Sequence, residues 1–156
     1  MIIMTRMALF FLLTLTASVN SAQAEARNPL EGLMIPPSSI VLFWAAWCAP
    51  CRAEIAAWPA LQQAAGAIPL YVIALDTPIE RSRTLLKSIP ADRVRHGGGS
   101  TFSVLAGWPQ RASGLPFAVL LDAQGRVCAS QNGGLDADRI TGMKRQCGVI
   151  SAAKKP

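Results

Sequence analysis

Residues 40–54 read IVLFWAAWCAPCRAE and contain the strongest structural signal in this chain. The apolar run Ile40–Trp44 predicts a strand buried on both faces, because it shows no alternation with polar residues. The segment Cys51–Ala65 is rich in alanine, and its large apolar side chains recur at helical spacing, which predicts a helix. Cys48 and Cys51 therefore lie where a strand passes into the N-terminus of a helix.

That position favours thiol chemistry. The thiolate is the nucleophile, and the partial positive charge at a helix N-terminus stabilises it. Cys48 falls just before the first turn, where free backbone N–H groups face its sulfur, and Pro50 suits an early helical position because no N–H donor is needed there. Cys51 falls on the helix itself. We predict an exposed attacking Cys48 and a buried resolving Cys51 that cycle between dithiol and disulfide.

A Cys-x-x-Cys pair is also compatible with half of a zinc site or with a static disulfide. A structural zinc site needs a second pair of ligands at suitable spacing. The remaining candidates are Cys128, Cys147 and the single His96, which form no such pair. The strand–helix context therefore favours a redox pair, with no bound metal or other cofactor.

Residues 43–54, FWAAWCAPCRAE, resemble the active-site segment of the thioredoxin fold, and in particular that of the TlpA/ResA/CcmG-like periplasmic thiol–disulfide oxidoreductases. The family motif is similar to W-C-x-P-C-[RK]-x-E. A second family signature, a loop proline that is cis and faces the cysteines, is matched by Pro116 in Gly114-Leu115-Pro116-Phe117. The resemblance covers about residues 38–147. It implies an α/β thioredoxin-like fold, a central mixed sheet flanked by helices, with a TlpA-type central insertion.

The resemblance also implies roles for particular residues. Glu54 stands at the position of the family's glutamate, where it can relay a proton to or from Cys51; the alternative is a plain surface carboxylate near a helix N-terminus. Thioredoxins proper have a buried aspartate six residues before the first cysteine, where this chain has Leu42. The expected catalytic residues are Cys48, Cys51, Glu54 and Pro116. The expected substrate contacts are Trp47, Ala49, Pro50 and Leu115, the last through its backbone.

The first 24 residues have the features of a signal peptide. Arg6 provides a positive charge, Met7–Val19 is apolar, and Ala22-Gln23-Ala24 is a small-residue cleavage site. The apolar run is shorter than the roughly 20 residues of a bilayer span, so a cleaved signal is favoured over an uncleaved membrane anchor. We therefore expect export to the bacterial periplasm.

Cleavage would leave 132 residues, enough for one domain with a proper core. We expect a lead-in over 25–37, a thioredoxin-like domain over 38–150 and a disordered tail over 151–156. Without Arg6 there are 14 basic and 9 acidic side chains, a net charge of +5. The basic residues are scattered, which favours a solvated surface over a nucleic-acid site, although an acidic partner or a membrane surface is compatible with the charge. We expect a monomer.

The rest of the chain predicts alternating elements. Ile68–Leu75 reads as a second buried strand, and Pro59 should kink the preceding helix. The other expected elements are a helix from Thr77 to about Ser88, a short strand at 94–96, a short helix from Ser100 or Thr101 to about Ala106, strands at 117–121 and 126–130 joined by a turn at 122–125, and a final helix at 136–146.

Cys128 and Cys147 form a separate question. One lies in the last predicted strand and the other at the end of the last predicted helix, which must return antiparallel across that strand. Their Cα atoms can then approach to about 5–6 Å, the range of a disulfide. An even cysteine count in an exported protein is consistent with a structural disulfide. The alternative is a second redox pair that exchanges with the first.

The sequence thus predicts a thiol–disulfide oxidoreductase that acts on protein disulfides or thiols. The resemblance favours a reductase, supplied with electrons by a membrane donor, with cytochrome c maturation as one role. Within the same class the alternatives are an oxidant or an isomerase. From other classes they are a copper-handling module that uses Cys48 and Cys51 as soft ligands, and a partner-binding domain with static disulfides.

Overall fold

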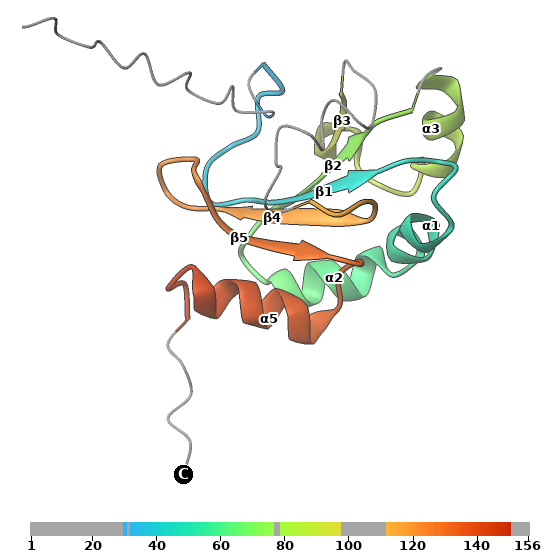
Figure 1. Cartoon of the computed structure of the whole chain (residues 1–156). Coiled ribbons are helices and arrows are strands. Elements are labelled where there is room, and N and C mark those ends of the chain that lie inside the picture. The colour runs from blue at the N-terminus through green and yellow to red at the C-terminus, as the bar shows by residue number, and fades with distance from the viewer. Residues whose placement is uncertain (1–29, 31, 77–78, 98–111, 151–156) are drawn as a thin grey trace, which may run out of the picture.

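The computed structural model describes residues 30, 32–76, 79–97 and 112–150, and centres on a five-stranded mixed sheet (Figure 1). Its strand order is β3-β2-β1-β4-β5. The strands are β1 Ile40–Trp44, β2 Leu70–Ala74, β3 Val94–His96, β4 Phe117–Leu121 and β5 Val127–Asn132. The helices are α1 Ala49–Ala56, α2 Trp58–Ala65, α3 Ile79–Leu85 and α5 Ala137–Gln146, with one 3₁₀ turn at Ala91–Arg93.

The strand β1 occupies the centre of the sheet and all five of its residues are buried. It pairs in parallel with β2, with Trp44 opposite Ala74, and antiparallel with β4, with Phe43 opposite Phe117. The two neighbours thus pair with both edges of β1, so its backbone is hydrogen-bonded on both sides. The predicted α/β fold with a mixed sheet is confirmed.

Two apolar layers cover the two faces of the sheet. On one face, alternate residues of the strands pack against α1, α2 and α5, which lie together on one side in Figure 1. The α2 and α5 helices are joined by the Lys144 ammonium, which donates to the Ala64 carbonyl oxygen at 2.8 Å. On the other face the lead-in residues Leu30, Leu33 and Ile35 cover the strands. Both faces of β1 are therefore shielded from water.

The predicted helix over 51–65 is two helices, and the expectation of one helix kinked at Pro59 is wrong. The α1 helix ends at Ala56, and α2 restarts at Trp58 with Pro59 in its first turn. Proline cannot donate to the helical ladder, and its ring clashes with the carbonyl four residues earlier. Pro59 is tolerated in the first turn of a helix. The chain therefore ends one helix at Ala56, passes through Ala57 and begins another at Trp58.

Further along the chain, several boundaries differ slightly from the prediction. The β4–β5 turn contains Gly125 at φ 75°, and β5 spans 127–132 rather than 126–130. Asp136 is the N-cap of α5 rather than its first residue, and its side chain accepts the Arg139 N–H. The signal peptide, the Thr77 cap, the 100–106 helix and the tail lie outside the described residues. Among those described, no helix is both long and apolar enough to cross a bilayer.

Candidate active site

A disulfide between Cys48 and Cys51 lies at the junction of β1 and α1. The two Cα atoms are 5.2 Å apart. Cys48 is the N-cap of α1, with extended backbone at φ −82° and ψ 103°, and its Sγ accepts the Cys51 N–H at 3.3 Å. Pro50 occupies the first turn. The strand–helix junction predicted from the sequence therefore places a backbone donor against the Cys48 sulfur.

Both cysteines of this pair are buried. Cys48 is 4 % exposed and Cys51 is fully buried. The prediction of an exposed Cys48 is therefore wrong for the oxidised protein, because the bond draws its sulfur toward Cys51, and both belong to the apolar layer under the helices. The exposed neighbours are Trp47, which is 59 % exposed, and Ala49 and Pro50. These three side chains belong to the accessible surface beside the pair, together with the exposed Arg52 that follows Cys51.

The α1 helix is fastened to the strand by two side chains. The Trp44 indole Nε1 donates to the Cys51 carbonyl oxygen at 2.9 Å, and Trp44 is fully buried, as its predicted core role requires. The Arg52 Nη1 donates to the Ala46 carbonyl oxygen at 3.1 Å. These bonds run from opposite directions, one from the strand to the helix and one from the helix to the loop. Together they hold the cysteine segment against β1.

A buried carboxylate, that of Asp76, also reaches this loop. Both carboxylate oxygens of Asp76 lie 2.8 Å from the Ala46 nitrogen. The Ser82 hydroxyl donates to Asp76 Oδ2 at 2.6 Å, and both side chains are buried. A lone aspartate after an apolar strand is the available sequence signal, but it does not say which backbone group the carboxylate meets.

Glu54 is buried, with 7 % of its surface exposed. Its Oε1 accepts the Leu135 N–H at 2.6 Å, and its Oε2 has no hydrogen-bond partner within the described structure. Burial raises the pKa of Glu54 to about 7, although the Leu135 hydrogen bond and the Arg139 charge act in the opposite direction. As the third residue after Cys51 on α1, it lies on a neighbouring part of the same helix surface. The Glu54 carboxyl can therefore exchange a proton near neutral pH beside the cysteine pair.

The loop between β5 and α5 joins Glu54 to Pro116. The Leu115–Pro116 peptide bond is cis, Pro116 is buried and Leu115 is half-buried. The Pro116 carbonyl oxygen accepts the Gly133 N–H at 2.9 Å. A Cβ on Gly134, whose φ is 91°, would lie 3.4 Å from Pro116 Cγ and 3.8 Å from Glu54 Oε1. The structure thus brings Pro116 and Glu54 within 4 Å of the same point, the position that a Gly134 Cβ would occupy.

Arg139 holds this glycine loop in place. Its Nη1 donates to the carbonyl oxygens of Gly133 and Gly134 at 2.7 and 2.8 Å. Its Nε also pairs with the Asp136 carboxylate at 3.5 Å. No local sequence signal marks Arg139, because it lies 85 positions beyond Glu54 in an otherwise ordinary amphipathic helix.

A second disulfide joins Cys128 in β5 to Cys147, the C-cap residue of α5. Their Cα atoms are 5.3 Å apart. Both cysteines contact the apolar layer that contains the first pair. The bond closes the β5–α5 unit at the end opposite to the Gly133–Leu135 loop.

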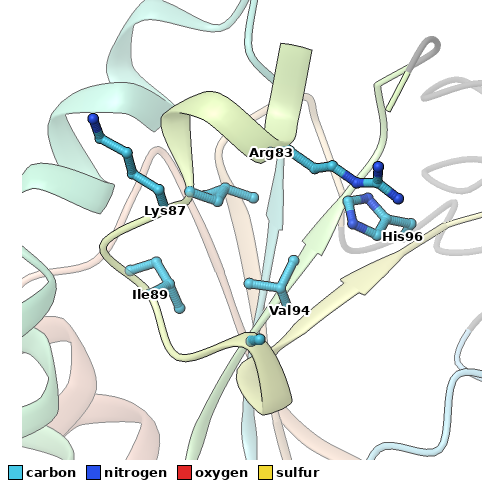
Figure 2. A pocket seen from close by; sticks show the side chains of 7 residues that line it. Arg83, Lys87, Ile89, Val94 and His96 are labelled. Atoms are coloured by element: carbon cyan, nitrogen blue, oxygen red, sulfur yellow. The ribbon is translucent and has the colours of Figure 1, made fainter. Parts of the chain in front are cut away.

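A separate cavity of about 350 Å³ lies between α3 and β3 (Figure 2). Among the described residues its lining is basic and apolar, without a thiol or a carboxylate. The lining residues are Arg83, Leu86, Lys87, Ile89, Ala91, Val94 and His96. Across the described residues, no group of three or more His, Cys, Asp or Glu side chains converges as a metal site. The chemistry-bearing groups are thus concentrated at the β1–α1 junction.

The chain is similar in sequence to a thiol:disulfide interchange protein DsbE homolog from Paracoccus denitrificans. The two are 29 % identical over 133 residues, which cover 80 % of this chain and 68 % of the relative. No family model matches the sequence.

Solved structures share the fold. A thioredoxin-related protein from Neisseria meningitidis superposes with a TM-score of 0.56 at 23 % identity, covering 75 % of this chain and 89 % of that one. A thiol:disulfide interchange protein of the thioredoxin family from Chlorobium tepidum gives a TM-score of 0.51 at 25 % identity, covering 69 % and 79 %.

Proposed function

We propose that this chain, which is a thioredoxin-fold thiol–disulfide oxidoreductase, works as a reductase of protein disulfides in the bacterial periplasm. The observation that carries the proposal is the Cys48 sulfur at the N-cap of α1, within 3.3 Å of the Cys51 N–H. After reduction, that donor and the helix N-terminus stabilise the Cys48 thiolate. Cys48 is then the attacking sulfur.

The reaction proceeds through a mixed disulfide. The Cys48 thiolate attacks one sulfur of the substrate disulfide, and the other substrate sulfur leaves as a thiolate that takes up a proton. The Cys51 thiol loses its proton and attacks the Cys48 sulfur, which releases the second substrate thiol. Two electrons pass to the substrate, and the protein is left with the Cys48–Cys51 disulfide. A membrane dithiol donor then restores the reduced state.

Glu54 is the base for the second step. Cys51 is fully buried, so the loss of its proton to bulk water is disfavoured. The Glu54 carboxyl has a pKa raised to about 7 by burial and an oxygen without a described partner, so it can accept that proton near neutral pH. Leu115, through its backbone, and the exposed Trp47, Ala49 and Pro50 would contact the substrate.

The reducing direction rests on the resemblance to the TlpA/ResA/CcmG-like oxidoreductases, among which apocytochrome cysteines are one class of substrate. A redox titration of the protein, with each cysteine pair followed by alkylation and mass, tests it. A potential near −270 mV, about that of thioredoxin, would support a reductase. A potential near −120 mV, about that of DsbA, would make the protein an oxidant.

Mixed-disulfide trapping tests the two cysteine roles. Cys51→Ser should accumulate mixed disulfides with periplasmic proteins, whereas Cys48→Ser should form none. A folded Cys51→Ser variant that traps no partner would contradict the assignment. Tight copper binding without disulfide exchange would point instead to metal handling. Mass measurement of the exported protein tests the expected cleavage after Ala24.

A further inference from the structure

Asp76 accepts a hydrogen bond from one particular peptide unit of the loop before the cysteines, the unit between Ala45 and Ala46. Its carboxylate accepts the Ala46 N–H, and the carbonyl oxygen of the same peptide unit, that of Ala45, accepts the Cys48 N–H at 3.1 Å. The peptide plane between residues 45 and 46 is thus held at both ends. One end is fixed by β2, through Asp76, and the other end supports the backbone of Cys48.

A third contact fixes the carboxylate itself. The Ser82 hydroxyl donates to Asp76 Oδ2 at 2.6 Å, and Ser82 is fully buried in α3. Asp76 is 7 % exposed, so little water competes for its oxygens. A buried carboxylate with two donors has a defined orientation, and it passes that orientation to the peptide plane that it binds.

We propose that Asp76 is a positioning residue for the nucleophile, which sets the reactivity of Cys48 through the Ala45–Ala46 peptide. This inference rests on the proposed role of Cys48 as the attacking thiol. If the peptide plane rotates, the Cys48 N–H loses its acceptor and the extended N-cap backbone is released. The Cys48 sulfur then moves away from the Cys51 N–H, and the thiolate loses a donor.

A direct charge effect of Asp76 would have the opposite sign. A carboxylate close to a thiolate disfavours it, so removal of the charge alone would lower the pKa of Cys48. Loss of positioning would raise it. Two other charged groups are unchanged in every variant below. Arg52 donates to the Ala46 carbonyl oxygen, and Glu54 is buried on α1.

The experiment measures the rate of iodoacetamide alkylation of Cys48 against pH in the reduced protein, with each cysteine read by peptide mass. Asp76→Ala should move the Cys48 curve to higher pH. On the part of the curve below the pKa of Cys48, each unit of rise slows alkylation at a given pH by about threefold, since a tenfold loss of thiolate is partly offset by higher nucleophilicity. Asp76→Asn retains an acceptor oxygen for Ala46 and should leave the curve close to that of the wild type.

Two further variants keep the test decisive. Val72→Ala, in the core of β2, the strand that precedes Asp76, should lower the melting temperature and leave the curve unmoved. Ser82→Ala frees one carboxylate oxygen and should move the curve in the same direction as Asp76→Ala, so it replaces that variant if Asp76→Ala does not fold.

The outcomes separate the explanations. Curves that shift to lower pH in both Asp76→Asn and Asp76→Ala would replace positioning by a charge effect. Unmoved curves in folded Asp76→Ala, or in Ser82→Ala if that variant stands in for it, would leave Asp76 a purely structural residue. If Cys48 of the wild type is not alkylated ahead of Cys51, the proposed function itself fails, independently of Asp76.

Discussion

The carboxylate of Glu54 and the backbone N–H of Leu135 meet at 2.6 Å, although 81 positions separate them in the sequence. The bond joins α1, which contains the cysteine pair, to the loop before α5. The acceptor of this hydrogen bond is the Glu54 carboxyl, and burial raises its pKa to about 7. Protonation of Glu54 is therefore coupled to the stability of the fold and, in the function proposed above, to the thiol chemistry.

The first prediction concerns stability against pH in the oxidised protein. The folded pKa of Glu54, about 7, lies above its ordinary value of 4.5, so the folded state binds the proton more tightly than the unfolded state. This contribution is complete below pH 4.5 and is lost as pH rises to 7. It amounts to about 3 kcal/mol, from roughly 1.4 kcal/mol per pKa unit.

Glu54→Gln should lack this dependence. Urea unfolding at several pH values should show the wild type losing stability relative to the variant between pH 4.5 and 7, with a constant difference above that range. Equal slopes for the two proteins would show that Glu54 titrates near its ordinary pKa.

The second prediction concerns the exchange rate of the same variant. Glutamine cannot accept the Cys51 proton, so resolution of the mixed disulfide should slow by about a hundredfold at pH 7. The wild-type rate should rise as Glu54 ionises around pH 7, and that limb should be absent from Glu54→Gln. Stopped-flow detection of the released substrate thiol measures this rate of resolution at each pH. A variant that retains the limb would assign it to another group, such as a cysteine thiol.

The third prediction compares two glycines with similar backbone angles. A Cβ on Gly134, whose φ is 91°, would contact both Pro116 and Glu54, whereas a Cβ on Gly125, at φ 75° in the β4–β5 turn, would have no atom within 4 Å. Alanine in either position should cost about 1–2 kcal/mol of stability, because L-residues disfavour positive φ. Only Gly134→Ala should also slow exchange, since its loop supports Glu54. Equal exchange rates in the two variants would remove that role from the loop.

The fourth prediction concerns the Cys128–Cys147 bond, which spans 19 positions. Replacing both residues with alanine should lower the free energy of unfolding by about 3 kcal/mol, since a loop of this length is no longer closed in the unfolded chain. Disulfide exchange at Cys48 and Cys51 should persist. Loss of exchange with unchanged stability would instead identify the second pair as a relay.

The fifth prediction concerns Trp47, which is 59 % exposed beside the buried pair. Trp47→Ala should raise KM for a protein substrate by about tenfold, because exposed tryptophans at interfaces contribute strongly to binding. Its melting temperature should hardly change. Val149→Ala, which truncates another exposed apolar side chain, is the matched control and should leave KM unaltered. An unchanged KM in Trp47→Ala would place the protein contact elsewhere.

Local sequence was sufficient for the features that depend on neighbours in the chain. An uninterrupted apolar run predicts β1, and Cys-x-x-Cys after such a run predicts a sulfur at a helix N-cap, because an apolar run and a helix cap are both defined by residues adjacent in the chain. The break at Pro59 shows the limit of this reasoning. Pro59 predicts a disruption of the helix. Whether it bends one helix or separates two depends on how the following segment packs.

Tertiary structure alone decided which groups surround the cysteines. Asp76 reaches Ala46 only because β2 is registered in parallel beside β1, and Glu54 meets Leu135 only because α5 returns along the same face. The burial that raises the Glu54 pKa and covers Cys48 has the same origin. Solvent exclusion is a sum over segments that are distant in the chain, so spacing and composition determine which side chains are available for chemistry, and packing determines their protonation and access.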